Sequence, residues 1–587
     1  MPLSPRKRPS VRDEAGQTSA VGSPASLIAK HHSIKVLKGL QEFHKNEVFC
    51  DYVLVAESRE FKVHRVVMAS CSDYFRVMLT GEMRESREGR VDLKGVSANG
   101  LQVVIEFAYT GLMELTVENV EEVLSAATHL QVTDAVELCS KYIESSIVVD
   151  NCVDVLNLAE LYSLSATYRK AQHFMLKHFE VMAKMGQYMK LNHNQLSQLL
   201  EDNSLRISSE YQLFELVLCW MQGKKEREQY VSELMRNVRL PLLSGEELVE
   251  KVSIVPLMRD NKECHELLTE AKDYHIVVSK QPLLQSKRTQ VRASEKYLVM
   301  CHRENLEYYN LENMHHGFLR DATIQLHHPA VVVVDNFMYA CGGKYDFNEN
   351  NEIATARCFR YDPRFDSWYE LTSMNEARKD FVLLATEGKL YAIAGQDENL
   401  VMCTTEMFDI ATNEWEVKAS MNHSLYGHAG SVYDGKLYVS GGQKFDGCCN
   451  DLEMYDPVDD MWVKRSPMMS ARLNHNMITV KDRIYCLCGN IEDNMGFPVP
   501  VITIEYYTPS NDQWTVCQKT LNIREAGACL MDDKIYIVGG LNGEHYFSDL
   551  VQCYTPLTEN LRIVEKFPTR LHGRACCVLT LPQYLST

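Results

Sequence analysis

Residues 436–462 have the sequence KLYVSGGQKFDGCCNDLEMYDPVDDMW. An apolar run ends at the glycine pair Gly441-Gly442, and Tyr455-Asp456-Pro457 then precedes Trp462. Similar pairs end four other apolar runs, at Gly342-Gly343, Ala394-Gly395, Cys488-Gly489 and Gly539-Gly540. The second glycines are separated by 52, 47, 47 and 51 residues. Because a fixed period of this length is typical of repeat architectures, the C-terminal half is predicted to be an array of similar units.

A second marker has the same period. Trp368, Trp415, Trp462 and Trp514 are separated by 47, 47 and 52 residues, and an aromatic residue lies shortly before each. Each unit holds about four short apolar runs joined by turn residues, which is typical of a blade of a kelch-type β-propeller. We expect the glycines to allow close backbone approach near the central channel. We expect each Trp to pack between adjacent blades, beside the preceding aromatic ring.

The number of blades follows from the order of the strands. We call the run before each glycine pair strand b, and the apolar run before it strand a. A first strand b at 296–301 has no strand a before it, and 573–581 resembles a strand a with no strand b after it. Six blades therefore close into a ring only if the C-terminal strand joins the first blade, which removes the open sheet edges. Strand a is expected at 329–334, 380–385, 428–433, 475–480 and 525–531.

Length and composition limit the possible classes of protein. A chain of 587 residues exceeds the size of a single hydrophobic core, so several domains are expected. A net charge of −18 argues against a general nucleic-acid binder. The 19 cysteines form no Cys-x-x-Cys pair, and no secretory signal or membrane span is recognised. Reduced thiols in the cytosol or nucleus are expected, Cys486 and Cys488 are expected to be buried, and no metal or cofactor is expected.

The region before the repeats mixes several kinds of segment. Residues 1–26 are predicted to be a disordered tail, in which Arg6, Lys7 and Arg8 are either a nuclear-import patch or simply solvated. Short strands are expected at 51–56 and 60–63. Thr116 is expected to cap a helix carrying an apolar stripe from Val117 to Leu130. Residues 151–275 have a helical period, and 281–294, with Gln281-Pro282, Lys287, Arg288 and Arg292, are predicted to be the linker into the propeller.

Two segments of this region resemble known domains. FCDYVLV (49–55) and FKVHRVVMASCSDYF (61–75) are similar to a BTB (POZ) domain. Residues 151–164, RLPL (239–242) and Tyr274-His275 resemble a BACK domain. With the kelch repeats, this order resembles the kelch-like family. The resemblance implies a multidomain fold: an α+β BTB/POZ domain (27–148), an all-α BACK domain (149–280), a linker (281–294) and an all-β six-bladed Kelch propeller (295–587).

The resemblance also implies a function. Kelch-like proteins are substrate adaptors of cullin-3 RING ubiquitin ligases, in which BTB dimerises and, with BACK, binds cullin-3, while the propeller recruits a protein substrate. The family's cullin-contacting motif matches Met83-Arg84-Glu85, after the predicted helix that holds Tyr74 and Phe75. Leu37, Leu40 and Phe43 resemble its dimer face, although they could equally face the domain's own core.

In the resembling family, the loops before each strand a face the substrate. Arginine in such loops suits a carboxylate or phosphate, which suggests a substrate peptide with acidic character. The loops at 344–352 and 491–500 are expected to add walls to the site. The substrate-binding rim is expected to contain Arg378, Tyr426, Arg472, Asn474, Arg524 and His572.

Other functions were compared with this one. A copper oxidase would need a Tyr, His and Cys cluster, and the pairs His315-His316 and His327-His328 have no match on neighbouring blades. His265-Glu266 begins like a zinc-protease helix but lacks the second His. We therefore expect no catalysis. A cytoskeletal, actin-associated or scaffold kelch protein stays open as the alternative, whereas a nuclear BTB repressor would usually carry zinc fingers.

Overall fold

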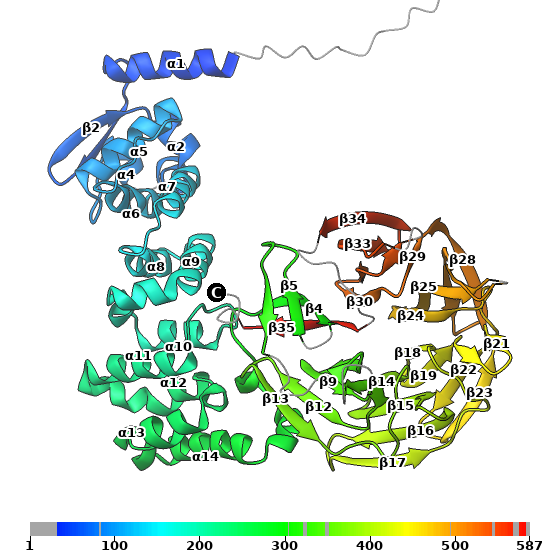
Figure 1. Cartoon of the computed structure of the whole chain (residues 1–587). Helices are drawn as coiled ribbons and strands as arrows, with labels where there is room; N and C mark the ends of the chain where they lie inside the picture. Colours follow the sequence, from blue (N-terminus) through cyan, green and yellow to red (C-terminus); the bar gives the residue numbers. More distant parts are fainter. Residues whose placement is uncertain are drawn as a thin grey trace, which may run out of the picture. The chain divides into compact units, whose positions relative to one another are not determined.

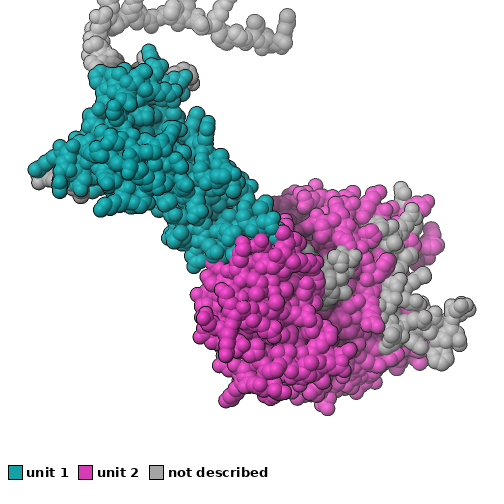
Figure 2. Space-filling model, turned by 90° about the vertical axis from the view of Figure 1, so that its left-hand side faces the viewer, with its two compact units in different colours: residues 1–171 teal, residues 172–587 magenta. Residues whose placement is uncertain are grey.

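The computed structural model describes residues 32–81, 84–302, 305–320, 326–346, 352–493, 495–542, 546–566 and 575–582. The chain divides into two compact units, residues 1–171 and 172–587 (Figure 2). The predicted tail over 1–26, Met83 and His572 lie outside the described residues. The boundary between the units falls inside the helical region expected over 149–280.

The first unit contains a three-stranded sheet of order β2-β1-β3. Strands β1 (Tyr52–Ala56) and β2 (Arg59–Val63) form the predicted pair, and β3 (Arg90–Asp92) runs parallel to β1. Glu57 and Ser58 turn the hairpin with left-handed backbone, as a two-residue turn between twisted strands requires. The helices are α1 (His32–Lys45), α2 (Arg65–Cys71), α3 (Asp73–Thr80), α4 (Arg84–Glu88), α5 (Ala98–Thr110), α6 (Val120–His129), α7 (Thr133–Ser145) and α8 (Cys152–Leu161).

The start of α6 carries the predicted cap. Thr116 and Asn119 exchange the two bonds of a capping box: the Thr116 amide donates to Asn119 Oδ1 (2.8 Å), and the Asn119 amide donates to Thr116 Oγ1 (3.3 Å). The main-chain oxygen of Thr116 also accepts the Val120 amide (3.1 Å), as at the start of a helix. The apolar stripe begins later than expected, because Val117 is exposed, whereas its members from Val120 to Leu130 are buried in the core.

Helices continue through the chain to residue 289, which confirms the helical period. Helix α9 (Ser165–Lys184) contains the unit boundary and has a non-helical backbone at His178. The following helices are η1 (Gln187–Lys190), α10 (His193–Glu201), α11 (Glu210–Gln222), η2 (Lys225–Tyr230), α12 (Val231–Asn237), η3 (Leu240–Leu242), η4 (Glu247–Val252), α13 (Pro256–Asp260), α14 (Lys262–Ile276), η5 (Val278–Leu284) and η6 (Lys287–Thr289). No helix in the described ranges has the length and apolar character needed to cross a membrane.

Within the described residues, six sheets follow, each built on four antiparallel strands, and Figure 1 shows them around a common centre. In the order a to d, blade 1 is β35 (Cys576–Leu581), β4 (Glu295–His302), β5 (Asn305–Tyr309) and β6 (His316–Leu319), and blade 2 is β8 (Ala330–Val334), β9 (Phe337–Cys341), β12 (Cys358–Asp362) and β13 (Ser367–Leu371). Blade 3 is β14 (Val382–Thr386), β15 (Lys389–Gln396), β16 (Val401–Asp409) and β17 (Glu414–Lys418), and blade 4 is β18 (Ala429–Tyr433), β19 (Lys436–Ser440), β22 (Leu452–Asp456) and β23 (Met461–Arg465). Blade 5 is β24 (Leu473–Val480), β25 (Arg483–Glu492), β27 (Thr503–Thr508) and β28 (Gln513–Thr520), and blade 6 is β30 (Gly527–Met531), β31 (Lys534–Val538), β33 (Leu550–Thr555) and β34 (Asn560–Lys566).

The ring closes as predicted. Strand β35, the last of the chain, pairs antiparallel with β4 from Cys576–Met300 to Leu581–Glu295. The a strands contact one another in a complete circle, β8, β14, β18, β24, β30, β35 and back to β8. Leu579 and Leu581 of the closing strand are fully buried. The six-bladed fold is therefore confirmed, including the use of the C-terminal strand to complete blade 1.

The repeated tryptophans connect neighbouring blades. Each indole Nε1 donates to a main-chain oxygen at the end of the preceding blade, as in Trp462 to Ala419 (2.8 Å) and Trp514 to Ser466 (2.8 Å). The ring of each Trp lies 5.1–5.3 Å from the preceding aromatic ring, such as Tyr455 beside Trp462 at 5.1 Å. The predicted packing role of this marker is confirmed.

The glycine pairs lie where two blades approach most closely. Gly441 has φ +60°, and a Cβ built there would lie 2.5 Å from the main-chain oxygen of Arg472 in the next blade. Gly442 donates its amide to the same oxygen at 2.8 Å. A side chain at this position would therefore push the blades apart.

The Gly441→Ala variant is expected to destabilise the propeller clearly more than Gly435→Ala. Gly435 also has positive φ (+72°), but a Cβ there would meet its nearest atom only at 3.8 Å, so it isolates the backbone strain of about 1–2 kcal/mol. Thermal melting followed by tryptophan fluorescence would measure both variants. Equal melting temperatures of the two variants would show that the space between Gly441 and the main-chain oxygen of Arg472 can hold a methyl group.

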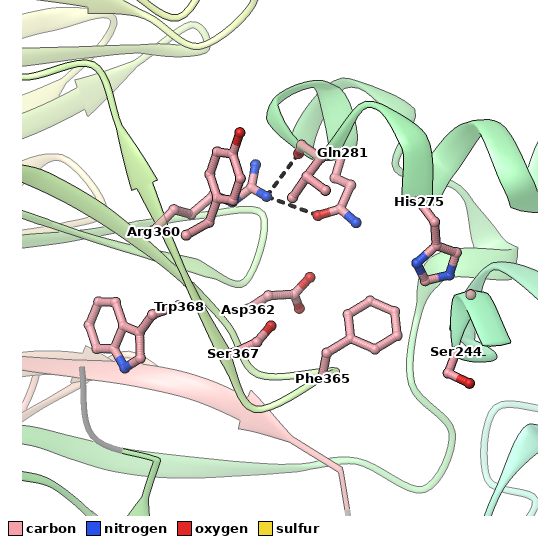
Figure 3. Close-up of a pocket in the computed structure, with 11 residues that line it drawn as sticks. Ser244, His275, Gln281, Arg360, Asp362, Phe365, Ser367 and Trp368 are labelled. Atoms are coloured by element: carbon pink, nitrogen blue, oxygen red, sulfur yellow. Dashed lines mark hydrogen bonds between the residues drawn. The ribbon is translucent and has the colours of Figure 1, made fainter. Parts of the chain in front are cut away.

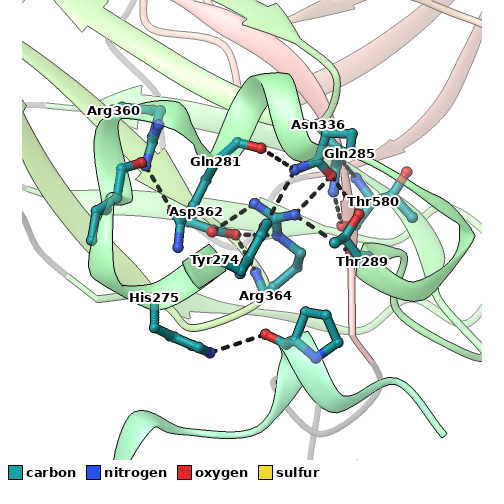
Figure 4. Close-up of polar contacts among 12 residues, drawn as sticks. Tyr274, His275, Gln281, Gln285, Thr289, Asn336, Arg360, Asp362, Arg364 and Thr580 are labelled. Atoms are coloured by element: carbon teal, nitrogen blue, oxygen red, sulfur yellow. Dashed lines mark hydrogen bonds and ion pairs between the residues drawn. The ribbon is translucent and has the colours of Figure 1, made fainter. Parts of the chain in front are cut away.

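The segment predicted to be a linker, 281–294, is packed instead of exposed. Arg292 is buried, its Nε pairs with Glu210 at 2.6 Å, and its other nitrogens donate to main-chain oxygens of residues 200, 202 and 237. On the propeller side, Arg364 holds Asp362 through two bonds of 2.7 Å and reaches Gln285 (2.8 Å), as Figure 4 shows. The bond from Arg364 to Gln285 joins the propeller to the connecting segment, and residues 172–587 form one compact unit.

Candidate partner-binding surfaces

Five blades share an unusual backbone position at the start of strand a. His328, Asp380, Gly427, Asn474 and Glu525 all have φ between +50° and +62° and all line one central cavity of about 560 Å³. The Gly427 amide donates to the Asp380 oxygen (2.8 Å), and the Asn474 amide donates to the Gly427 oxygen (2.7 Å). We call these five residues the inner ring. Left-handed backbone at non-glycine residues costs free energy and is concentrated at functional sites.

The inner ring lies at one end of the propeller, together with the b–c loops. Strands a and c begin at this end, and strands b and d end there, because neighbouring strands of each blade are antiparallel. The turns between a and b and between c and d lie at the opposite end. The connecting segment contacts that opposite end, through Arg364 in the c–d turn of blade 2. The helices of the same unit therefore contact the end opposite the inner ring. We call the inner-ring end the mouth of the propeller.

Two of the expected rim residues lie inside the propeller and not on its surface. Arg378 and Arg472 are fully buried, and their guanidinium groups pair with Glu406 (2.9 Å) and Glu505 (2.7 Å). Each also donates to the main-chain oxygen of a b strand, Ala394 or Cys488. Neither guanidinium is accessible to a substrate carboxylate. The interpretation of these arginines as substrate ligands therefore has to be corrected: they brace the loops before strand a.

The other rim residues lie nearer to the mouth. Asn474 belongs to the inner ring and lines the cavity. Tyr426 is half-buried, and burial together with the nearby carboxylates of Glu492 and Asp380 raises its pKa. Arg524 is buried, with Nη1 3.2 Å from Glu525. Their participation in substrate binding stays a prediction.

Sequence reasoning missed the acidic members of this face. Asp380 and Glu525 lie one or two residues beyond the positions that were singled out, at the start of strand a itself. Their common signal is a polar residue or glycine placed directly before the apolar run, at the same 47–52-residue spacing as the glycine pairs. The sequence contains this spacing, but only the left-handed backbone in the structure shows that the position is special.

In the first unit, α3 and α4 present a second surface. Tyr74 is half-buried and Val77, one turn later, is 62% exposed, whereas Phe75 is fully buried in the core. Phe75 therefore cannot contact a partner directly and instead anchors α3. The main chain of α4 is fixed, because Tyr52 donates to the Glu85 oxygen (2.9 Å) and Arg65 donates to the Ser86 oxygen (2.9 Å). Glu85 keeps a partly exposed side chain on this fixed segment.

Helix α1 leaves apolar side chains open in the single chain. Leu37 and Leu40 are half-buried, and Phe43 is 43% exposed. The C-terminal end of the helix is held by His44, whose ring stacks on Tyr109 at 4.1 Å. Ile34 and Val36 are also exposed. The expected helix is confirmed, and its apolar surface is available for a partner.

A smaller pocket of about 370 Å³ lies between the helices and blade 2 (Figure 3). His275, Gln281 and Phe365 line it, and Arg360 donates to Gln281 Oε1 and to the Val278 oxygen, both at 2.9 Å. Phe365 also lies against the His275 ring, at 5.4 Å. These contacts join the propeller to the helices, so we assign the pocket to that junction.

The structure also places the two cysteines that the sequence singled out. Cys486 and Cys488 are both buried, as predicted, and burial raises their pKa to about 12. Among the described residues, no group of three or more His, Cys, Asp or Glu side chains is arranged as a metal site would need.

Comparison with known proteins covers all three regions. The BTB/POZ domain matches residues 40–147, the domain described as BTB And C-terminal Kelch matches 152–253, the KLHDC2/KLHL20/DRC7 Kelch-repeats domain matches 327–540, and the Kelch motif matches 524–560. Kelch-like protein 26 of Danio rerio is 34% identical over 572 residues, which are 94% of this chain and 94% of the relative. The chain belongs to the kelch-like family. Kelch-like protein 13 of Homo sapiens (37% identical; 96% of this chain, 88% of the relative) and kelch-like protein 31 of Homo sapiens (37%; 93% and 88%) are further members that it resembles.

Membership of this family accounts for the two surfaces. The BTB, BACK and Kelch domains are protein–protein interaction modules, and the surfaces found on α3–α4 and at the propeller mouth belong to the first and the last of them. The similarity extends over 88–94% of the length of these relatives.

Proposed function

We propose that the chain is a substrate-recognition adaptor of a cullin-3 RING ubiquitin ligase and is not itself an enzyme. In this proposal, the BTB and BACK domains bind the N-terminal region of cullin-3, and the propeller mouth recruits a protein for ubiquitination. The observation that carries the proposal is the similarity to kelch-like proteins through all three domains. The adaptor supplies proximity, and the chemistry occurs on the ligase's other subunits.

The α3–α4 surface supports the cullin-binding part. A fixed main chain with a partly exposed Glu85 costs little ordering entropy on binding. Tyr74 and Val77 lie on one face of α3, three residues apart, and offer the apolar part of a contact. We therefore propose Tyr74, Val77, Met83 and Glu85 as the cullin-facing residues, with Phe75 as support beneath them.

The α1 surface supports a homodimer. Leu37, Leu40 and Phe43, with Ile34 and Val36, would be covered by the partner's BTB domain. A dimer presents two propeller mouths, so two weak contacts with one substrate gain strength through effective concentration. We propose that this assembly works in the cytoplasm, and in the nucleus as well.

The double variant Met83→Ala/Glu85→Ala is expected to lower binding of the cullin-3 N-terminal region by at least about tenfold, as loss of interface anchors does. Affinity of the full-length chain would be measured by biolayer interferometry. Glu137→Ala, which removes an exposed ion pair with Lys141 on α7, is the control and should bind like the wild type.

Retained cullin binding in the double variant would refute the proposed site. Absence of binding by the wild type would refute the ligase role itself and favour the cytoskeletal or scaffold alternative, which an actin co-sedimentation experiment would then examine.

A further inference from the structure

Four successive blades display a bulky apolar side chain at the tip of the loop between strands b and c. Phe445 is fully exposed, Leu400 is 68% exposed, and Phe497 and Tyr546 are each 63% exposed. Single exposed apolar residues are normal on a protein surface. The same loop carries at least one such residue in each of blades 3, 4, 5 and 6, which is a pattern, and we call Leu400, Phe445, Phe497 and Tyr546 the apolar tips.

The tips are held out by their own loops. The Asp397 carboxylate accepts the amides of Asn399 and Leu400, both at 2.6 Å, and these bonds lower its pKa. In blade 5, Asp493 accepts the amides of Met495 (2.8 Å) and Phe497 (2.9 Å). Such side-chain-to-backbone turns fix the loop before any partner arrives.

The remaining two loops are fixed in related ways. In blade 6, Asn542 Oδ1 accepts the Tyr546 amide at 3.0 Å. In blade 4, strands β20 (Gln443–Lys444) and β21 (Gly447–Cys448) form a hairpin whose two-residue turn presents Phe445. Rigid, exposed aromatic side chains at low entropy cost are the usual anchors of protein interfaces.

The base of every one of these loops is paired with the chain just before the inner ring. The paired residues are Lys379 with Gln396, Tyr426 with Gln443, Leu473 with Asn490, and Arg524 with Leu541. The first member of each pair is followed directly by Asp380, Gly427, Asn474 or Glu525. The apolar tips therefore stand around the mouth whose floor is the inner ring.

The charge of this mouth is negative. Asp380 and Glu525 line the cavity, and Asp446, Glu492 and Asp493 are exposed on the surrounding loops. The cavity is also lined by Lys344, and most other cations of the same segments are engaged with carboxylates. Arg378 and Arg472 are buried with Glu406 and Glu505, and Lys379, Lys444 and Arg524 pair with Glu398, Asp451 and Glu525.

We propose that the propeller mouth binds a peptide segment of its substrate that carries lysine or arginine together with bulky apolar side chains. This inference rests on the proposed recruiting function and names the class of substrate. Cationic groups would pair with Asp380 and Glu492, while apolar side chains of the peptide pack against Phe445, Phe497 and their neighbours. It replaces the acidic substrate that the buried arginines had suggested.

The test is a selection of 12-residue random peptides displayed on phage against the immobilised full-length chain. Peptides enriched in Lys or Arg and in Phe, Leu or Trp are the expected result. A selected peptide, synthesised with a fluorescent label, would then be titrated by anisotropy at 50 and 200 mM NaCl. Affinity is expected to fall with salt, since the attraction between exposed charges is screened.

Matched variants locate the binding face. Phe445→Ala/Phe497→Ala is expected to lower the affinity for the peptide by about tenfold or more. Asp380→Asn/Glu492→Gln is expected to weaken it and to reduce its salt dependence. The control is Val458→Ala/Leu557→Ala, which removes exposed apolar side chains from the c–d turns at the opposite end and should leave binding unchanged.

Enrichment of acidic peptides, no enrichment, or a peptide that is insensitive to both mouth variants would overturn the proposal. Failure here can be told apart from failure of the adaptor role, because cullin-3 binding by the full-length chain is a separate measurement that does not involve the propeller mouth. A chain that binds cullin-3 but selects acidic peptides would keep the adaptor function and lose only the substrate class.

Discussion

Arg472→Met is expected to lower the free energy of unfolding of the propeller by about 3–5 kcal/mol, since removing one member of a buried ion pair leaves the other charge uncompensated. Glu505 is fully buried, and besides Arg472 it accepts the Met469 amide at 2.8 Å. Arg472 also braces the close approach of blades 4 and 5, because its main-chain oxygen accepts the Gly442 amide.

Denaturant unfolding followed by tryptophan fluorescence would measure this loss, because four of the chain's five tryptophans belong to the propeller. The matched control is Arg357→Met, whose pair with Glu370 is exposed and worth at most about 1 kcal/mol. The double variant Arg472→Met/Glu505→Met should be more stable than Arg472→Met alone. Equal stability of Arg472→Met and Arg357→Met would contradict the assignment of a buried brace.

Removing residues 573–587 is expected to have the largest effect of all: the propeller should lose its cooperative unfolding transition. The deletion takes away β35, exposes the edge of β4 and opens the circle of a strands. It also breaks a reciprocal contact with blade 2, in which Asn336 Nδ2 donates to the Thr580 main-chain oxygen (2.8 Å) and Asn336 Oδ1 accepts the Thr580 amide (2.7 Å) (Figure 4).

Limited proteolysis and calorimetry of the full chain would detect this change. A chain that ends at Pro582 keeps the whole of β35 and should behave like the wild type. A truncated chain without β35 that melts at the wild-type temperature would mean that ring closure contributes nothing to stability.

The architecture could be predicted because it depends on periodic markers. A glycine that lies close to a neighbouring blade recurs in five units, and a tryptophan that bonds to the blade before it recurs in four, so the spacing of both residues reports the repeat. The closing strand followed from the order of the strands, because the first strand b has no strand a before it and the last strand a has no strand b after it. The roles of Phe75, Arg378 and Arg472 could not be predicted in this way, because burial depends on which side of a short segment faces the core.

The mouth was hidden from sequence reasoning for a related reason. Residue type alone predicts that an arginine in such a loop binds a ligand. Arg378 and Arg472 instead donate to buried main-chain oxygens, which need hydrogen-bond partners inside the protein. Leu400 and Phe445 lie in short polar loops where an exposed apolar residue carries no periodic signal. Only the side-chain turn around Asp397 and the β20–β21 hairpin show that these two tips are held outward.

The packed connector also bears on which sites of a substrate could be modified. Arg292 and Arg364 fasten the propeller to helices α10–α14. A protein bound at the mouth would therefore keep a fixed orientation relative to those helices. For an adaptor, the choice of acceptor lysines would then follow from the docking pose. A looser connector would broaden the choice of acceptor lysines without changing which substrate is bound.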